Sequence, residues 1–156
     1  MKKKIITKIS EGLGNQLFMY ANSYSLSKKN NFNLYIDTLS GYYQNKHIYE
    51  FILDRFNISA KKANYQFTFG NFHRNLFKKV LIFYDRFNKK KKFFFEKKNS
   101  DKITQYYPLD LAKTNDFFFL DGNFESEKYF SDYRNDLLKE FAIKNNSHFF
   151  GNKYLD

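Results

Sequence analysis

The sequence predicts an α/β protein in which helices flank a parallel sheet, with a Rossmann-like arrangement at its N-terminus. A basic, β-branched run over residues 4–9 leads into two glycines, and an apolar pattern of helical period follows over residues 16–29. The short apolar segment Asn33 to Asp37 completes a strand, a helix and a strand within 37 residues, which is the order of a βαβ unit. A third apolar run, Asp116 to Asp121, predicts a further buried parallel strand.

Two amphipathic helices follow from the spacing of apolar residues. The first is expected to bury one stripe made of Leu17, Tyr20, Ala21 and Tyr24. The second is predicted over residues 131–142, with Ser131 as its N-cap. Its apolar positions are Tyr133, Leu137, Leu138 and Phe141. Residues 145–156 lack periodicity and are expected to form a connector.

Composition limits the classes of site and location. The 156 residues are 42% hydrophobic and contain no cysteine, which predicts one folded domain without disulfides or thiolate metal ligands. His47, His73 and His148 are scattered without ligand spacing, so no metal site is predicted. Lys8 and Glu11 interrupt the N-terminal apolar run, and no window reaches the ~18 apolar residues of a membrane span. A cytoplasmic protein is therefore expected.

The glycine loop between the first strand and the first helix is the main candidate site. Gly12 and Gly14 allow close approach of a ligand, and the first N–H groups of a helix suit an anionic or hydroxyl oxygen. Asn15 and Gln16 add amides that both donate and accept hydrogen bonds. Leu17 stands where a dinucleotide fingerprint needs glycine, and no Walker lysine follows. The alternative is an ordinary β-to-α turn with Asn15 as the helix cap.

Four carboxylates at predicted strand ends are further candidates. Asp37 follows the second strand and is suited to a sugar hydroxyl, although capping of its own loop explains it equally well. Asp121, Glu125 and Glu127 flank the third strand, where a general base for an acceptor hydroxyl could lie. Acidic residues also cap such turns, so both interpretations stay open.

A basic, aromatic-rich segment over about residues 61–98 carries most of the net charge. It holds twelve lysines and arginines against Asp85 and Glu96, which is +10 of the total +11. Apolar residues recur there at helical spacing: Phe72, Leu76, Phe77, Val80, Tyr84 and Phe87. Such a helix suits either peripheral contact of residues 72–98 with the inner face of an anionic membrane or packing on its own domain. The helical pattern argues against a stacking platform for nucleic acid.

Three segments, in order along the chain, resemble a known family. They are Gly12 to Ala21; Tyr35 to Thr38 with His47 to Glu50 and Leu53 to Ile58; and Leu120 to Phe130. Together they are similar to the glycosyltransferase family 11 enzymes, the bacterial α-1,2-fucosyltransferases of surface glycans. Asn123 and Glu125 depart from the family pattern.

The resemblance implies a GT-B type glycosyltransferase of two Rossmann-like halves. Such enzymes transfer L-fucose from GDP-β-L-fucose to the 2-hydroxyl of a galactoside, with inversion and without a metal. Carried over, the donor and sugar site falls on Gly12 and Gly14, with Asn15 and Gln16 as catalytic residues.

The family's His-x-Arg-Arg segment, which steadies the departing diphosphate, does not occur in this sequence. We therefore expect residues 1–144 to be the N-terminal α/β domain, with the basic segment as an insertion, and residues 145–156 to lead towards a missing nucleotide-binding half. Alone, this chain is expected to be inactive. The alternative is a non-catalytic domain that docks through its basic segment on an anionic membrane or an enzyme partner.

Overall fold

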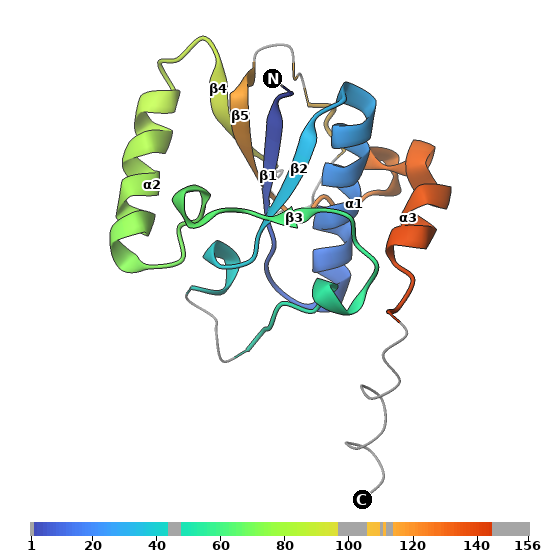
Figure 1. Ribbon diagram of the computed structural model, residues 1–156. Helices are drawn as coiled ribbons and strands as arrows, with labels where there is room; N and C mark the ends of the chain where they lie inside the picture. Colours follow the sequence, from blue (N-terminus) through green and yellow to red (C-terminus); the bar gives the residue numbers. More distant parts are fainter. Residues whose placement is uncertain (1, 44–47, 97–105, 110, 112–113, 145–156) are drawn as a thin grey trace, which may run out of the picture.

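The chain folds around a five-stranded sheet in which every strand pair is parallel (Figure 1). This computed structural model describes residues 2–43, 48–96, 106–109, 111 and 114–144. The strand order is β3-β2-β1-β5-β4. The strands are β1 Lys4–Lys8, β2 Asn33–Asp37, β3 Lys61–Lys62, β4 Lys91–Phe95 and β5 Thr114–Asp121. The predicted α/β class, with a parallel sheet flanked by helices, is confirmed, and the strand order is consistent with a Rossmann-like fold.

The sheet is apolar on both faces because helices cover both. Ile5 pairs with Phe118 and Ile6 with Phe119, so neighbouring residues along each strand enter opposite layers. Helices α1 (Leu13–Asn30) and α3 (Arg134–Glu140) lie on one side, and α2 (Phe72–Asp85) lies on the other (Figure 1). Covered faces of this kind are the usual condition of an all-parallel sheet.

Helix α1 is longer and more deeply enclosed than the sequence predicts. It begins three residues before the predicted Gln16, since Gly12 is its N-cap, and Asn31 ends it in the left-handed conformation (φ 55°). Met19, Tyr20, Ala21 and Tyr24 are buried as core residues. Polar side chains of α1 are buried beside them: Gln16, Asn22, Ser23, Ser25 and Ser27.

The basic segment is built into the sheet. The expected insertion spans about residues 61–98, and its described residues, 61–96, supply β3, α2 and β4. Strand β4 pairs with β5, and Phe93 stacks on Phe119 with ring centroids 4.9 Å apart. Neither β3 nor β4 is predicted from the sequence, because lysines occupy much of both strands.

The C-terminal helical prediction needs correction. Ser131 is not an N-cap: residues Ser131–Tyr133 form a 3₁₀ turn, and α3 begins only at Arg134 without a side-chain cap. Leu137 is buried as predicted, whereas Leu138 is 57% exposed. The Tyr20 hydroxyl donates to Glu140 and so ties α3 to α1. The predicted connector, residues 145–156, lies outside the described residues.

Candidate functional site

The strand order defines one crevice in which a ligand is expected. From β1 the chain proceeds outward to β2 and β3 on one side, while β5 and β4 lie on the other. The order therefore reverses between β1 and β5, and open α/β sheets bind ligands at the carboxyl ends of strands at such a switch point. The loops that meet there follow Lys8 in β1 and Asp121 in β5.

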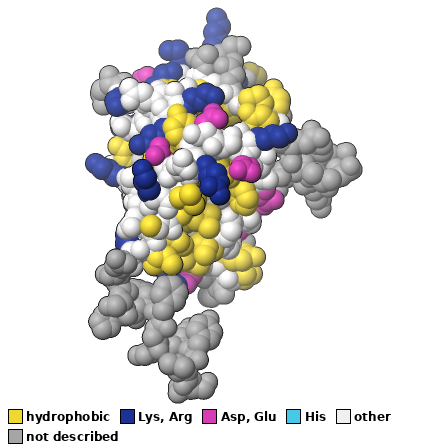
Figure 2. All heavy atoms as spheres, turned by 90° about the vertical axis from the view of Figure 1, so that its right-hand side faces the viewer, with side chains coloured by type: hydrophobic (Ala, Val, Ile, Leu, Met, Phe, Trp, Pro, Cys, Tyr) yellow, Lys and Arg dark blue, Asp and Glu magenta, His cyan; other side chains and the backbone are white. Residues whose placement is uncertain are grey.

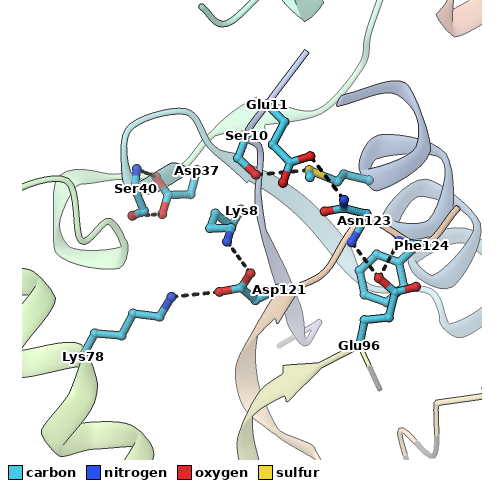
Figure 3. Close-up of polar contacts among 11 residues, drawn as sticks. Lys8, Ser10, Glu11, Asp37, Ser40, Lys78, Glu96, Asp121, Asn123 and Phe124 are labelled. Carbon is cyan, nitrogen blue, oxygen red and sulfur yellow. Dashed lines mark hydrogen bonds and ion pairs between the residues drawn. The ribbon is translucent and has the colours of Figure 1, made fainter. Parts of the chain in front are cut away.

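Glu11 links the two loops across this crevice (Figure 3). Its carboxylate accepts a hydrogen bond from the Asn123 amide (3.2 Å) and another from Asn15. Its backbone carbonyl accepts from Gln16 (2.8 Å). Glu11 therefore organises the start of α1 and the loop after β5 together.

Two non-glycine residues have positive φ beside the crevice, one in each loop. Glu11 has φ 65° and Phe124 has φ 55°. The Phe124 loop is held in place by Glu96, which accepts from the backbone N–H groups of Asn123 (2.7 Å) and Phe124 (2.9 Å). Left-handed backbone at such residues costs about 1–3 kcal/mol and clusters at ligand sites. Its occurrence on both sides of the switch point supports this location for the site.

Two lysines share one carboxylate at the crevice (Figure 3). Lys8 forms an ion pair with Asp121, and Lys78 reaches the same carboxylate from α2 at 3.0 Å. Burial alone raises the pKa of Asp121, but the two ammonium groups outweigh it and lower that pKa below its usual value. Asp121 is thus ionised at neutral pH, and the cluster keeps one excess positive charge.

A cavity of about 270 Å³ opens beside these lysines. Its wall includes Lys8, Ser10, Glu11, Asn75 and Lys78, so it offers both charged and neutral hydrogen-bonding groups. A larger cavity of about 420 Å³ lies at the opposite edge of the sheet, near the start of β2. We place the site at the smaller one because Lys8 and Glu11, at the carboxyl end of β1, line it; the predicted site residues of the glycine loop, Gly12 to Gln16, do not.

Gln16 is fully buried and joins three parts of the chain. Its amide nitrogen donates to the carbonyls of Glu11 (2.8 Å) and Glu50 (2.7 Å), and its oxygen accepts from Ile52 N–H (3.0 Å). Both amide hydrogens are therefore used within the protein. The geometry gives Gln16 the task of positioning the loop.

The glycines border open space. Gly12 has an ordinary extended conformation (φ −74°), and a Cβ added there lies 3.9 Å from the Tyr49 ring. At Gly14, which is exposed, an added Cβ meets no heavy atom within 4 Å among the described residues. Neither backbone strain nor crowding in this part of the chain requires glycine. The space above the loop is available to a ligand.

The remaining predicted residues have distinct surroundings. Asn15 lies in the first turn of α1 and is not the cap, so the capping alternative is wrong; its amide donates to Glu11. Asp37 caps its own loop, accepting from the N–H groups of Leu39 and Ser40 (both 3.0 Å). Burial raises the pKa of Asp37 despite these hydrogen bonds.

The other acids and histidines are less enclosed. Glu125 is exposed and accepts from Asn123 at 3.1 Å, and Glu127 is exposed in a 3₁₀ turn. His73 is exposed in the first turn of α2. His47 and His148 lie outside the described residues.

Sequence reasoning missed several groups that build the crevice: Lys8, Glu11, Asn75, Lys78, Glu96 and Asn123. Lys8 and Glu11 stand at the carboxyl end of a predicted strand, so their location was a usable signal. Lys78 and Glu96 give no comparable signal, because their placement depends on how α2 and β4 pack.

The fold and the crevice define the chain as an α/β protein with a parallel sheet and a polar site, lined by lysines and carboxylates, at the switch point of that sheet. Within the described residues, no group of three or more His, Cys, Asp or Glu side chains is arranged to hold a metal ion. No helix in the same part of the chain has the length and hydropathy to cross a membrane. No protein-family model, curated protein or solved structure matches this chain.

Proposed function

We propose that this chain is the sugar-facing N-terminal half of an inverting, metal-independent fucosyltransferase of GT-B type. The complete enzyme transfers L-fucose from GDP-β-L-fucose to the 2-hydroxyl of a galactoside. The proposal starts from the resemblance of three segments to the family 11 glycosyltransferases. It assigns Gly12, Gly14 and Asn15 to contact with sugar, and Gln16 to positioning.

The observation that carries the proposal is the convergence of those three segments in the fold. Gln16 in the first binds Glu50 in the second, 34 residues away. Glu11, beside the first, binds Asn123 in the third, 112 residues away. Motifs that bind one sugar are expected to lie around one place, and both contacts are made by residues in or just before the first turn of α1.

Of the two carboxylates Glu11 and Asp121, Glu11 is better suited to act as the base in this scheme. The acceptor 2-hydroxyl gives its proton to the base while its oxygen attacks C1 of fucose, and the bond from C1 to the GDP oxygen breaks. Asp121 is a poor choice because two ammonium groups hold its proton affinity low. Glu11 instead accepts from the neutral amides of Asn15 and Asn123.

The departing diphosphate needs positive charge and backbone donors in an enzyme without a metal. The excess charge of the Lys8, Lys78 and Asp121 cluster contributes to that field, as do the first N–H groups of α1. The family's diphosphate-binding arginine has no counterpart in this sequence. The proposal therefore assigns it to a second half and predicts negligible transfer by these 156 residues alone.

Sugar binding by the chain tests the site directly. Amide NMR spectra are recorded with methyl β-galactoside and, for comparison, methyl α-mannoside. We expect selective shifts at Gly12, Gly14 and Asn123 with the galactoside. A Cβ at Gly14 meets no heavy atom within 4 Å among the described residues, so Gly14→Leu puts a side chain at this open position and should abolish these shifts. Lys29→Leu, an exposed change at the far end of α1, should leave them intact. Equal responses to both sugars would contradict the proposal.

The nucleotide sequence beyond codon 156 tests the half-enzyme part. We expect the reading frame to continue, or to resume after a frameshift, into a segment with His-x-Arg-Arg. Joined to that segment, the chain should transfer fucose from GDP-fucose to a galactoside. Fucose transfer by the purified 156-residue chain would refute the need for a second half.

A further inference from the structure

The apolar stripe of α2 points away from the protein. The helical spacing of apolar residues identifies this stripe in the sequence. The alternative that the stripe packs on its own domain is wrong, because its side chains are exposed. Seven large apolar side chains are between 45% and 77% exposed. They are Phe72, Leu76, Phe77, Val80, Phe83, Tyr84 and Phe87. We call this surface the α2 outer face.

The opposite side of α2 is anchored, which fixes the direction of the outer face. Leu81 and Ile82 pack against the core layer around Ile6. Lys78 is paired with Asp121, and Asp85 accepts hydrogen bonds from the backbone N–H groups at the start of β4. Rotating the helix to bury its apolar stripe would break these anchors.

The charged side chains that α2 and the residues just after it expose have one sign. Lys79, Arg86, Lys89 and Lys90 are exposed on the helix or just after it. Asp85 is the only acid between residues 71 and 92, and it is 5% exposed. On the side of the molecule that carries α3, by contrast, Lys or Arg and Asp or Glu are interspersed (Figure 2).

We propose that the α2 outer face docks on an anionic lipid bilayer, with its apolar side chains between the headgroups. The helix is 14 residues long, about 21 Å at 1.5 Å per residue, and packs against the sheet through Leu81 and Ile82. A continuous apolar face bordered by cations is the pattern of interfacial helices, and anionic headgroups complement those cations. The inference is independent of fucosyl transfer.

Charge argues against a second copy of this chain as the occupant. A symmetric dimer through the outer face would place the same patch of each copy against the other. The exposed cations at Lys79, Arg86, Lys89 and Lys90 would then face one another with no exposed acid from residues 71–92 to offset them. Lipid headgroups supply the negative charge that the exposed side chains of residues 71–92 lack.

Tryptophan fluorescence tests the proposal, because the sequence contains no tryptophan. Phe83→Trp places a reporter on the outer face at a position that is 55% exposed, and Leu138→Trp places a control on α3 at one that is 57% exposed. With phosphatidylglycerol–phosphatidylcholine vesicles, we expect a blue shift for Phe83→Trp and none for Leu138→Trp. The same shift at both positions, or at neither, overturns the proposal.

Charge reversal tests the electrostatic part. Lys89→Glu with Lys90→Glu should lower vesicle partitioning about tenfold or more, while Arg134→Glu with Lys139→Glu on α3 should leave it unchanged. Circular dichroism confirms the fold of each variant. Equal binding to pure phosphatidylcholine overturns the anionic specificity. A blue shift of Phe83→Trp that grows with protein concentration without vesicles assigns the face to a second copy instead.

Discussion

Helices α1 and α2 cover opposite faces of one sheet. Helix α1 buries its apolar stripe, whereas α2 exposes its apolar stripe to solvent. Over its 18 residues, α1 buries polar side chains such as Gln16 and Ser23 together with its apolar stripe. Over its 14 residues, α2 leaves its apolar stripe exposed and turns a lysine and an aspartate inward. The spacing of apolar residues identifies both as helices. A few buried polar contacts determine which face of each helix is turned towards the sheet.

These contacts differ in kind between the two helices. In α1, Ser23 accepts a hydrogen bond from Thr7 in β1 (2.5 Å) and donates to the Met19 carbonyl (2.6 Å). In α2, the anchors are charged groups, Lys78 and Asp85, that reach loop and strand ends. Removing a contact of either kind tests whether these side chains fix the helices.

The largest effect is expected at Gln16. Gln16→Ala removes three buried hydrogen bonds and leaves two carbonyls and an N–H without their partner. It should lower the free energy of unfolding by about 2–4 kcal/mol, measured by urea denaturation. Asn15→Ala, which changes a partly exposed amide in the same turn, is the control and should cost less than half as much.

The corresponding test in α2 is Asp85→Ala. The Asp85 carboxylate accepts from the N–H groups of Lys92 (3.0 Å) and Phe93 (3.1 Å). Its loss should destabilise the protein by about 1.5–3 kcal/mol and loosen the contact between α2 and β4. Hydrogen exchange at those two amides reports the local change. Asp116→Ala, at an exposed position of β5, is the control, and an equal loss there would contradict the anchoring role.

The Lys78 anchor makes stability depend on pH. The pKa of Asp121 is below its ordinary value of 3.8, so the ion pairs stabilise the fold above that value. This stabilisation is lost as the pH falls through the lowered pKa. Thermal unfolding of Asp121→Asn between neutral and acid pH should therefore show a shallower acid decline than the original chain. An unchanged decline would show that the ion pairs do not govern it.

Asp37 should change stability with pH in the direction opposite to Asp121, so the two residues can be compared within one protein. Burial raises its pKa above 3.8, so its contribution to stability is present at low pH and is lost as the pH rises through the folded value. Asp37→Asn should remove this second dependence and steepen the net acid decline. The same change of slope in both variants would be inconsistent with the two pKa directions.

The elements at the N-terminus follow directly from local signals. Strand Asn33–Asp37 has the predicted bounds. The acidic residue that follows the short apolar run marks the end of the strand in the sequence itself. Strands β3 and β4 are missed because Lys61 and Lys62 form one, and Lys91 and Lys92 begin the other. Strand pairing with a distant partner, not local composition, makes these residues extended.

In the crevice, too, some features follow from local sequence patterns and others depend on contacts between distant parts of the chain. The glycine loop and Asp121 are located by their positions at strand ends, which local patterns predict. The side-chain partners are not, since Lys78 comes from 43 residues away and Asn123 meets Glu11 across 112 residues. Gln16 shows most clearly what residue type alone cannot predict. Its amide is suited to binding a ligand, but the side chain is buried and forms its hydrogen bonds within the protein.

The smallest expected effect is a gain in stability at Asn22, in the enclosed middle of α1. Its side chain is 0% exposed, and neither its oxygen nor its nitrogen has a hydrogen-bond partner within the described part of the chain. Asn22→Leu should raise the free energy of unfolding by about 1 kcal/mol, because it replaces a desolvated amide with an apolar group of similar size. Ser23→Ala, which breaks the Thr7 contact, should lower it by a similar amount. Opposite signs at adjacent residues of one helix would show that satisfied polar contacts, and not burial of polar side chains as such, hold α1 against the sheet.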